Sequence, residues 1–144
     1  MNFKNEMILK FKAKSVNESF ARSAVAAFLL PLDPTLEELN DIKTAVSEAV
    51  TNCIVHAYES EEEDIELACR IDGDTVHITV SDTGIGIADI EKARQPFFTT
   101  KPDDERSGMG FTLMETFMDS LEVLPNKPRG VIVRMSKKIG SKGG

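Results

Sequence analysis

A long amphipathic segment near the middle of the chain places the strongest constraint on its fold. From Thr35 to about Tyr58, apolar residues recur every three or four positions, which is the period of a helix buried along one side. Thr35-Leu-Glu-Glu38 has the form of a capping box, which indicates where that helix begins. The apolar stripe comprises Leu39, Ile42, Val46, Ala49, Cys53 and Ala57. A helix with such a stripe must pack against a second layer of structure.

The rest of the chain supplies one further long helix and several β-rich segments. Ser15-Val-Asn-Glu18 resembles a second capping box, and the helix it opens is expected to end near Leu30, before Pro31 and Pro34. Asp72-Gly-Asp74 separates two β-rich runs and predicts a hairpin. In chain order, we expect a strand at 5–13, a solvated acidic loop at 59–64, strands at 65–71 and 75–81, a glycine-rich loop at 82–88, a short helical piece at 89–93, a mobile loop at 94–110, a helix at 111–120, and a final hairpin at 121–124 and 131–136. This order favours an α+β two-layer sandwich.

Composition limits the classes of partner and compartment. The 144 residues suffice for a single domain spanning 1–144, with a core but no second domain. A net charge of −7 disfavours general binding to nucleic acid or to anionic membranes. No apolar run approaches the roughly 20 residues that cross a bilayer, and no signal peptide is evident. Cys53 and Cys69 lack metal-binding spacing and are interpreted as small buried apolar residues. We therefore expect a cytoplasmic protein.

Three motifs carry candidate chemistry, and the first lies on the long helix. A spacing of four places Glu48, Asn52 and His56 on one helical stripe, beside the apolar face, where a helix can line a pocket. A solvated glutamate with a locally hydrogen-bonded asparagine would produce the same pattern. His56 is interpreted as structural.

The second motif, Ser81-Asp82-Thr-Gly84-Ile-Gly86, follows a predicted strand directly. Its two glycines allow a sharp turn close to a flat ligand, and the carboxylate at the strand end can accept hydrogen bonds from an exocyclic amine. The pattern lacks the third glycine of the dinucleotide-binding fingerprint. An ordinary Asp/Gly turn remains an equally good explanation of this segment by itself.

The third motif, Glu105-Arg-Ser-Gly108-Met-Gly110-Phe111, precedes the third predicted helix. Backbone N–H groups at a helix start, together with the helix dipole, favour an anion such as phosphate. Arg106 can add a charge-assisted hydrogen bond to that anion. Lys101 is a second cationic candidate, although an exposed loop lysine is at least as good a description of it.

Taken in order, these motifs resemble the ATP-binding (Bergerat) fold of the GHKL superfamily of gyrases, chaperones, histidine kinases and mismatch-repair proteins. That fold is a mixed, mostly antiparallel sheet covered on one face by helices. Four segments are similar to the anti-sigma F factors of spore-forming bacteria: Asn17-Glu-Ser-Phe-Ala-Arg22, Val46-Ser-Glu-Ala-Val-Thr-Asn52, Pro96-Phe-Phe-Thr-Thr-Lys-Pro102 and Glu105-Arg-Ser-Gly-Met-Gly-Phe111. The resemblance covers about residues 5–137.

The resemblance implies a site for ATP or ADP with Mg²⁺. Asn52 would supply a metal ligand, Glu48 would be the general base, and Asp82 would bind the adenine amine, with room provided by the glycines of its loop. The remaining nucleotide-binding residues implied by the resemblance are Gly84, Gly86, Thr99, Lys101, Arg106, Ser107, Gly108, Met109 and Gly110.

The resemblance also implies partners. Members of this family are homodimers that bind an RNA polymerase sigma factor and phosphorylate a serine of a small, STAS-type anti-anti-sigma protein. Arg22 matches a residue that contacts both partners, although a surface arginine would be the simpler interpretation without the family. One departure concerns the last hairpin, where Val131 and Ile132 follow Gly130 in place of the family's Gly-Thr pattern. Nucleotide affinity or base selectivity is therefore expected to differ.

Two other functions compete with the kinase. One is an ATPase in which Glu48 activates water, although such proteins rely on a following transducer domain that this chain is too short to include. The other is a nucleotide-gated binding module with negligible turnover. A detached histidine-kinase catalytic domain fits less well, because Glu48 is atypical there and no dimerisation helices with an acceptor histidine precede it.

Overall fold

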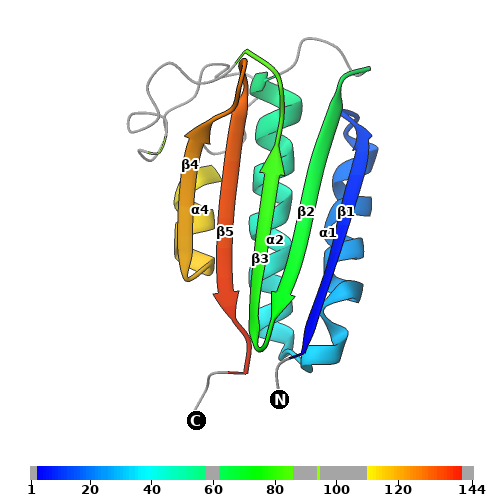
Figure 1. The fold of residues 1–144 in the computed structure, drawn as a ribbon, viewed down its shortest axis with the longest axis vertical. Helices are drawn as coiled ribbons and strands as arrows, with labels where there is room; N and C mark the ends of the chain where they lie inside the picture. The colour runs from blue at the N-terminus through cyan, green and yellow to red at the C-terminus, as the bar shows by residue number, and fades with distance from the viewer. Residues whose placement is uncertain (1–2, 58–61, 86–93, 95–109, 141–144) are drawn as a thin grey trace.

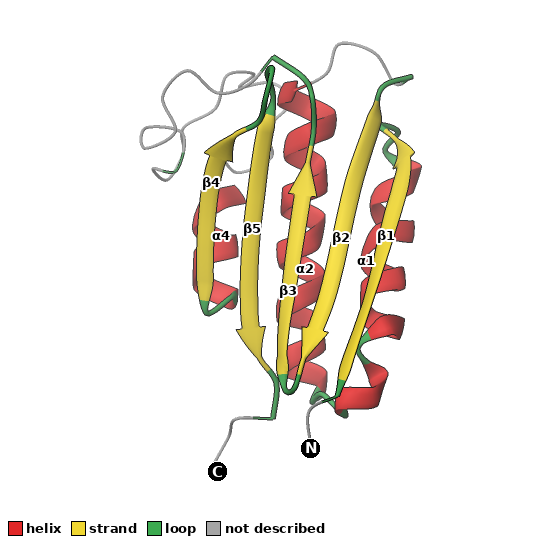
Figure 2. Ribbon diagram, in the orientation of Figure 1, coloured by secondary structure: helices red, strands yellow, loops and turns green. Residues whose placement is uncertain are grey.

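The computed structural model describes residues 3–57, 62–85, 94 and 110–140, which form a sheet covered on one face by helices. The strands are β1 (Lys4–Lys12), β2 (Asp64–Asp72), β3 (Thr75–Ser81), β4 (Ser120–Pro125) and β5 (Val131–Lys138). The helices are α1 (Val16–Phe28), α2 (Leu36–Asn52) and α4 (Gly110–Phe117). All three lie behind the sheet in Figures 1 and 2, so the predicted two-layer sandwich is confirmed. No helix in the described ranges is long and apolar enough to span a membrane.

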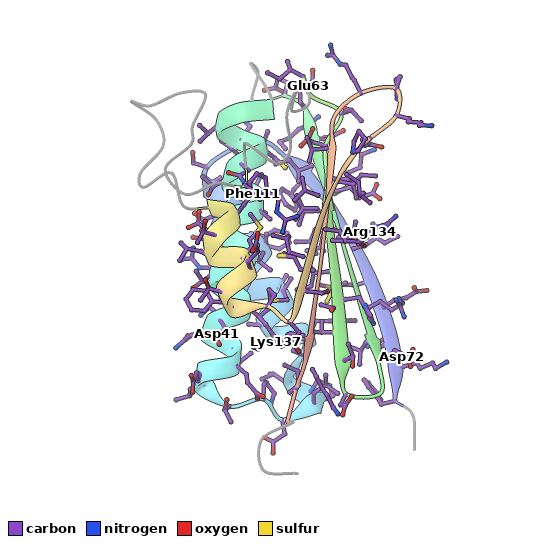
Figure 3. The ribbon with its side chains drawn as sticks, turned by 90° about the vertical axis from the view of Figure 1, so that its left-hand side faces the viewer. Asp41, Glu63, Asp72, Phe111, Arg134 and Lys137 are labelled. Atoms are coloured by element: carbon purple, nitrogen blue, oxygen red, sulfur yellow. The ribbon has the colours of Figure 1, made fainter. Side chains whose placement is uncertain are left out.

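The sheet has the strand order β1-β2-β3-β5-β4, and every pairing between these described strands is antiparallel. Strand alternation separates its two faces. The face toward the helices is apolar: Ile65, Leu67, Cys69 and Ile71 of β2 lie beside Val76, Ile78 and Val80 of β3 and Val133 and Met135 of β5. The opposite face carries polar side chains such as Arg134, which projects away from the helices in Figure 3. A sheet with one buried face explains the period of two in these segments.

Helix α2 begins as its sequence predicts. The Thr35 side chain accepts a hydrogen bond from the Glu38 backbone at 3.1 Å, and the Glu38 carboxylate accepts one from the Thr35 backbone at 2.8 Å. Its buried side contains Ile42, Ala45, Val46, Ala49 and Val50, against the sheet and α1. After Asn52 the helix continues as a π-helical turn, Cys53–Ala57. The predicted helix to about Tyr58 therefore changes its hydrogen-bonding pattern five residues before its end.

The capping box predicted at Ser15 is wrong. Ser15 has helical dihedral angles (φ −54°, ψ −35°), and its side chain makes no capping bond. Two backbone bonds form the first turn instead, from Asn17 N to the Lys14 carbonyl and from Glu18 N to the Ser15 carbonyl. The Glu18 carboxylate pairs with Arg22 rather than folding back on the helix start. Because a capping serine needs extended dihedral angles, this local turn excludes the box.

The other predicted helices and strands in the described residues agree with the structure to within a few residues. The largest differences are at the ends of two helices. Helix α1 ends at Phe28, and Pro31 lies in a short 3-10 turn, Leu30–Leu32. Helix α4 ends at Phe117 rather than at Ser120, which already pairs with Ser136 in the sheet. The predicted helical piece at 89–93 and most of the predicted loop at 94–110 lie outside the described residues.

Candidate functional site

The C-terminal half of α2 brings two oxygen-bearing side chains to the first residue of α4. A β-carbon built on Gly110 would lie 3.3 Å from Glu48 Oε1 and 3.4 Å from Asn52 Oδ1. Gly110 is buried, and the next residue, Phe111, points between the two layers in Figure 3. The carboxylate and the amide predicted from the sequence therefore converge on one point, where the start of a helix exposes backbone N–H groups.

Asp82 follows β3 directly and is buried, with 5% of its surface exposed. Its Oδ1 accepts backbone hydrogen bonds from Gly84 N at 2.9 Å and from Val131 N at 3.2 Å. Burial raises the pKa of the Asp82 carboxyl, and its hydrogen bonds from Gly84, Cys53 and Val131 act in the opposite direction. The predicted Asp-x-Gly loop thus contains a buried carboxylate held by backbone donors, whereas the aspartate of an ordinary surface turn would be exposed to solvent.

The turn between β4 and β5 packs against the backbone of Asp82. Asn126 Nδ2 donates to the Asp82 carbonyl at 2.8 Å, and Asp82 N donates to the Val131 carbonyl at 3.0 Å. Gly130, with φ +112°, lies so close that a β-carbon there would be 2.1 Å from the Asp82 carbonyl oxygen. The hairpin sequence shows a missing hydroxyl at Val131, but the contribution of the turn is a backbone N–H, which every residue except proline supplies.

Cys53 is buried as predicted, but it is also polar in its contacts. Its Sγ donates a hydrogen bond to Asp82 Oδ2 at 3.4 Å. Burial, the charge of Asp82 and this hydrogen bond together raise the pKa of the Cys53 thiol well above its usual value. Cys69 is also buried, and burial raises its pKa to about 12. The contact between Cys53 and Asp82 leaves no pattern in the sequence, because 29 residues separate them.

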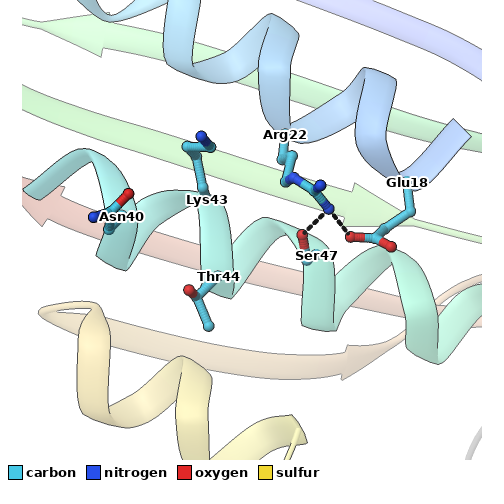
Figure 4. Close-up of a pocket in the computed structure, with 6 residues that line it drawn as sticks. All are labelled: Glu18, Arg22, Asn40, Lys43, Thr44 and Ser47. Atoms are coloured by element: carbon cyan, nitrogen blue, oxygen red, sulfur yellow. Dashed lines mark hydrogen bonds and ion pairs between the residues drawn. The ribbon is translucent and has the colours of Figure 1, made fainter. Parts of the chain in front are cut away.

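Arg22 lies on α1, at a hollow of about 300 Å³ between α1 and α2. Its guanidinium pairs with the Glu18 carboxylate and reaches Ser47 Oγ at 3.5 Å (Figure 4). The remaining lining residues, Asn40, Lys43 and Thr44, come from α2. Ser47 immediately precedes Glu48, so the same helix borders both this hollow and the Glu48–Asn52 pair.

Several predicted residues cannot be placed. The candidates outside the described residues are Gly86, Thr99, Lys101, Arg106, Ser107, Gly108 and Met109. Their contributions remain predictions. The described part of the site therefore consists of Glu48 and Asn52 at Gly110, and of Asp82 with Gly84, Cys53 and Val131 around it.

The comparisons with known proteins agree with this geometry. Residues 11–137 match the family model described as a histidine kinase-like ATPase domain. The chain is 58% identical over 141 residues to the Anti-sigma F factor of Thermoanaerobacter sp. (strain X514), covering 98% of this chain and 99% of that protein. It is 57% identical over 138 residues to the Anti-sigma F factor of Clostridium perfringens (strain 13 / Type A), covering 95% and 99%.

Among solved structures, the RsbU and RsbW domains of Rv1364c from Mycobacterium tuberculosis match with a TM-score of 0.68 and 17% identity. The match covers 94% of this chain and 32% of that longer one. At this identity the likeness shows a shared fold.

Proposed function

Because this chain belongs to the anti-sigma F factors, a family of histidine kinase-like ATPase domains, we propose that it is an ATP-dependent serine kinase and sigma-factor inhibitor. It would bind Mg-ATP, sequester a sporulation sigma factor of the sigma F type, and phosphorylate a serine of a STAS-type anti-anti-sigma protein. The observation that carries the proposal is the convergence of Glu48 and Asn52 oxygens on the buried start of α4. We assign this function to residues 1–144 acting as one cytoplasmic domain.

The adenine end of the site is Asp82. A carboxylate offers about four acceptor positions, and backbone N–H groups from Gly84 and Val131 take two of them on Oδ1. Oδ2, which also accepts from Cys53 Sγ, has a position left for the exocyclic amine of adenine. Guanine presents a carbonyl oxygen at the corresponding position, which would face the carboxylate unfavourably. Asp82 therefore supports selection of adenine nucleotides over guanine nucleotides.

The phosphate end fits a magnesium ion by its donor chemistry. The Asn52 amide oxygen is a hard neutral ligand, and it lies beside the Glu48 carboxylate at Gly110. Mg²⁺ prefers such oxygens and usually retains water and substrate phosphate among its ligands. When bound, it would screen the negative charge of the phosphates. Asn52 would hold the ion, while the start of α4 would contribute backbone donors to the phosphates.

Glu48 is the proposed general base. Its carboxylate would accept the proton of the substrate serine as the serine oxygen bonds to the γ-phosphorus. The bond between that phosphorus and the bridging oxygen breaks at the same centre, and ADP leaves with the electron pair. A base positioned in this way contributes on the order of 10²- to 10⁴-fold to the rate. Glu48 and Asn52 are one helical turn apart, so α2 fixes their relative positions.

The hollow at Arg22 is the proposed contact for protein partners. The Arg22 side chain is about one-third exposed (36%), and its present partner is the carboxylate of Glu18 on the same helix. An acidic side chain from a partner can replace Glu18 at the guanidinium, since the pair is partly exposed to solvent, which screens its attraction. We assign binding of the sigma factor and of the anti-anti-sigma protein to this surface. We also propose that the functional unit is a homodimer.

The experiment that tests the kinase uses the serine substrate directly. The chain is incubated with Mg-ATP labelled at the γ-phosphate and with a candidate anti-anti-sigma protein, and the label on serine is measured. Glu48→Gln is expected to lower labelling by at least about 100-fold while leaving ATP-dependent sigma binding intact. Glu37→Gln, a change in the first turn of the same helix, is the matched control and should label normally.

Each outcome distinguishes a different function. No serine labelling by the unmodified protein, together with ATP-dependent sigma binding, would replace the kinase by a nucleotide-gated binding module. Release of phosphate without labelled partner would indicate an ATPase. Equal labelling by Glu48→Gln would remove Glu48 from the role of base.

A further inference from the structure

Cys53 supplies the only hydrogen bond recorded to Asp82 Oδ2 within the described residues. We infer that Cys53 is a positioning residue, whose thiol orients the Asp82 carboxylate so that Oδ2 presents one acceptor position to the exocyclic amine of adenine. This inference rests on the proposed nucleotide binding and adds to it a determinant of base recognition.

The first argument is a count of acceptor positions. Oδ1 accepts from Gly84 N and Val131 N, which uses both of its lone pairs. Oδ2 accepts from Cys53 Sγ, which uses one of its two. One position is left, and it suits a single N–H of an amine. As far as the described residues go, loss of the thiol would leave Oδ2 with two unused positions and no fixed donor, so the carboxylate plane would be less restricted.

The second argument is the geometry of the contact. Cys53 Sγ lies 3.4 Å from Asp82 Oδ2, and both residues are buried, with 3% and 5% of their surfaces exposed. An ionised carboxylate can only accept hydrogen bonds, so the thiol is the donor in this contact.

The third argument concerns where the two side chains originate. Cys53 is the first residue of the π-helical turn that follows α2, and Asp82 is the first residue after β3. Asn52, proposed to hold the metal, immediately precedes Cys53 in the sequence. Two consecutive residues thus link the two ends of the proposed site. Asn52 belongs to the phosphate end, and the Cys53 thiol contacts Asp82 at the adenine end.

The test compares two ligands that differ by the amine alone. Dissociation constants of the intact protein for Mg-ATP and for the triphosphate of purine riboside, which lacks the 6-amino group, are measured by calorimetry. Cys53→Ala is expected to reduce the preference for ATP about five- to tenfold, because the donor that orients Oδ2 is lost and the net contribution of one typical hydrogen bond is of this size. Binding of the purine riboside triphosphate should change less than twofold. Cys53→Ser, which retains a donor, should restore at least part of the preference.

Cys69→Ala is the matched control, because Cys69 is a second buried cysteine, on β2, whereas the thiol bonded to Asp82 is that of Cys53. It should leave the ratio of the two constants unchanged. A readout without nucleotide is the infrared S–H stretch, which should lie at lower frequency for Cys53 than for Cys69; the two alanine variants assign the bands.

The outcomes separate this inference from the proposed function. If the unmodified protein binds neither triphosphate, the proposed function itself fails. If it prefers ATP and Cys53→Ala preserves that preference, the positioning role is refuted while nucleotide binding stands. Equal weakening of both ligands, or a serine variant no better than alanine, would also refute it, because a packing defect explains those results.

Discussion

Gly130 provides the sharpest test of how the last hairpin holds Asp82. Gly130→Ala would introduce a β-carbon at φ +112°, a region that side-chain-bearing residues avoid at a cost of about 1–3 kcal/mol. That carbon would lie 2.1 Å from the Asp82 carbonyl oxygen and 2.8 Å from Thr83 Cα. Both are backbone atoms, so relief requires movement of the chain, which typically costs a further 1–3 kcal/mol. We expect a total loss of roughly 4 kcal/mol of unfolding free energy.

The matched control is Gly140→Ala. Gly140 also has a positive φ of +72°, but a β-carbon there would meet no atom of the described residues within 4 Å. Only left-handed strain remains, about 1–2 kcal/mol. The difference between the two variants, roughly 3 kcal/mol, therefore measures the close approach to Asp82.

Urea unfolding followed by far-ultraviolet circular dichroism is the appropriate assay, because the chain has no tryptophan. For a domain of this size, a difference of 3 kcal/mol corresponds to a melting temperature lower by about 10 °C. Total stabilities of about 5–15 kcal/mol mean that the Gly130 variant should still fold. It should also bind ATP less tightly than the Gly140 variant, because Asp82 moves. Equal midpoints for the two variants would show that the hairpin does not press on Asp82.

Three further changes probe the site and the helix that carries it. Asp82→Asn should lower the ratio of ATP affinity to GTP affinity by about tenfold or more. Burial raises the pKa of the Asp82 carboxyl, so ionising this group in the folded protein lowers the stability of the parent as pH rises through that pKa. In calorimetric scans Asp82→Asn should therefore melt at a higher temperature than the parent at pH 7, and the difference should shrink toward pH 4. Gly110→Ala should change stability by less than about 1 kcal/mol but weaken Mg-ATP binding, because its methyl group would displace Glu48 and Asn52; unchanged calorimetric affinity would contradict this. Thr35→Ala should cost about 1 kcal/mol in urea unfolding and leave nucleotide affinity unaltered.

The fold was predictable because its elements carry periodic signals. The stripe of α2 and the alternation in β2 and β3 each follow the period of the structure that they form. The hairpin at Gly73 followed from the two residues between Asp72 and Thr75, and Gly73 indeed has a positive φ of +67°. The failure at Ser15 has a different origin. A capping box is a pattern of residue types, whereas the cap depends on dihedral angles that the neighbouring turn determines.

The candidate site was predictable only where its residues repeat along one element or form a recognisable loop. Glu48 and Asn52 share a helical stripe, and Asp82 ends a strand before glycines, so the sequence marks all three. The backbone donor from Val131 leaves no such mark, because an N–H group is common to nearly all residues. Family patterns therefore drew attention to the missing hydroxyl at this position rather than to the donor that is present.

The π-helical turn shows why the role of Cys53 escaped sequence reasoning. An α-helical stripe drawn through Ala49, Cys53 and Ala57 makes Cys53 one more apolar residue of the core, and its 3% exposure agrees with that. The structure adds that the chain changes to π-helical bonding at this residue, and π turns are frequent at functional sites. Because a thiol is small and apolar enough for the core yet still donates a weak hydrogen bond, one side chain can satisfy packing and a buried carboxylate together. The periodicity of the sequence reports the packing alone, and only the position of Asp82 reveals the hydrogen bond.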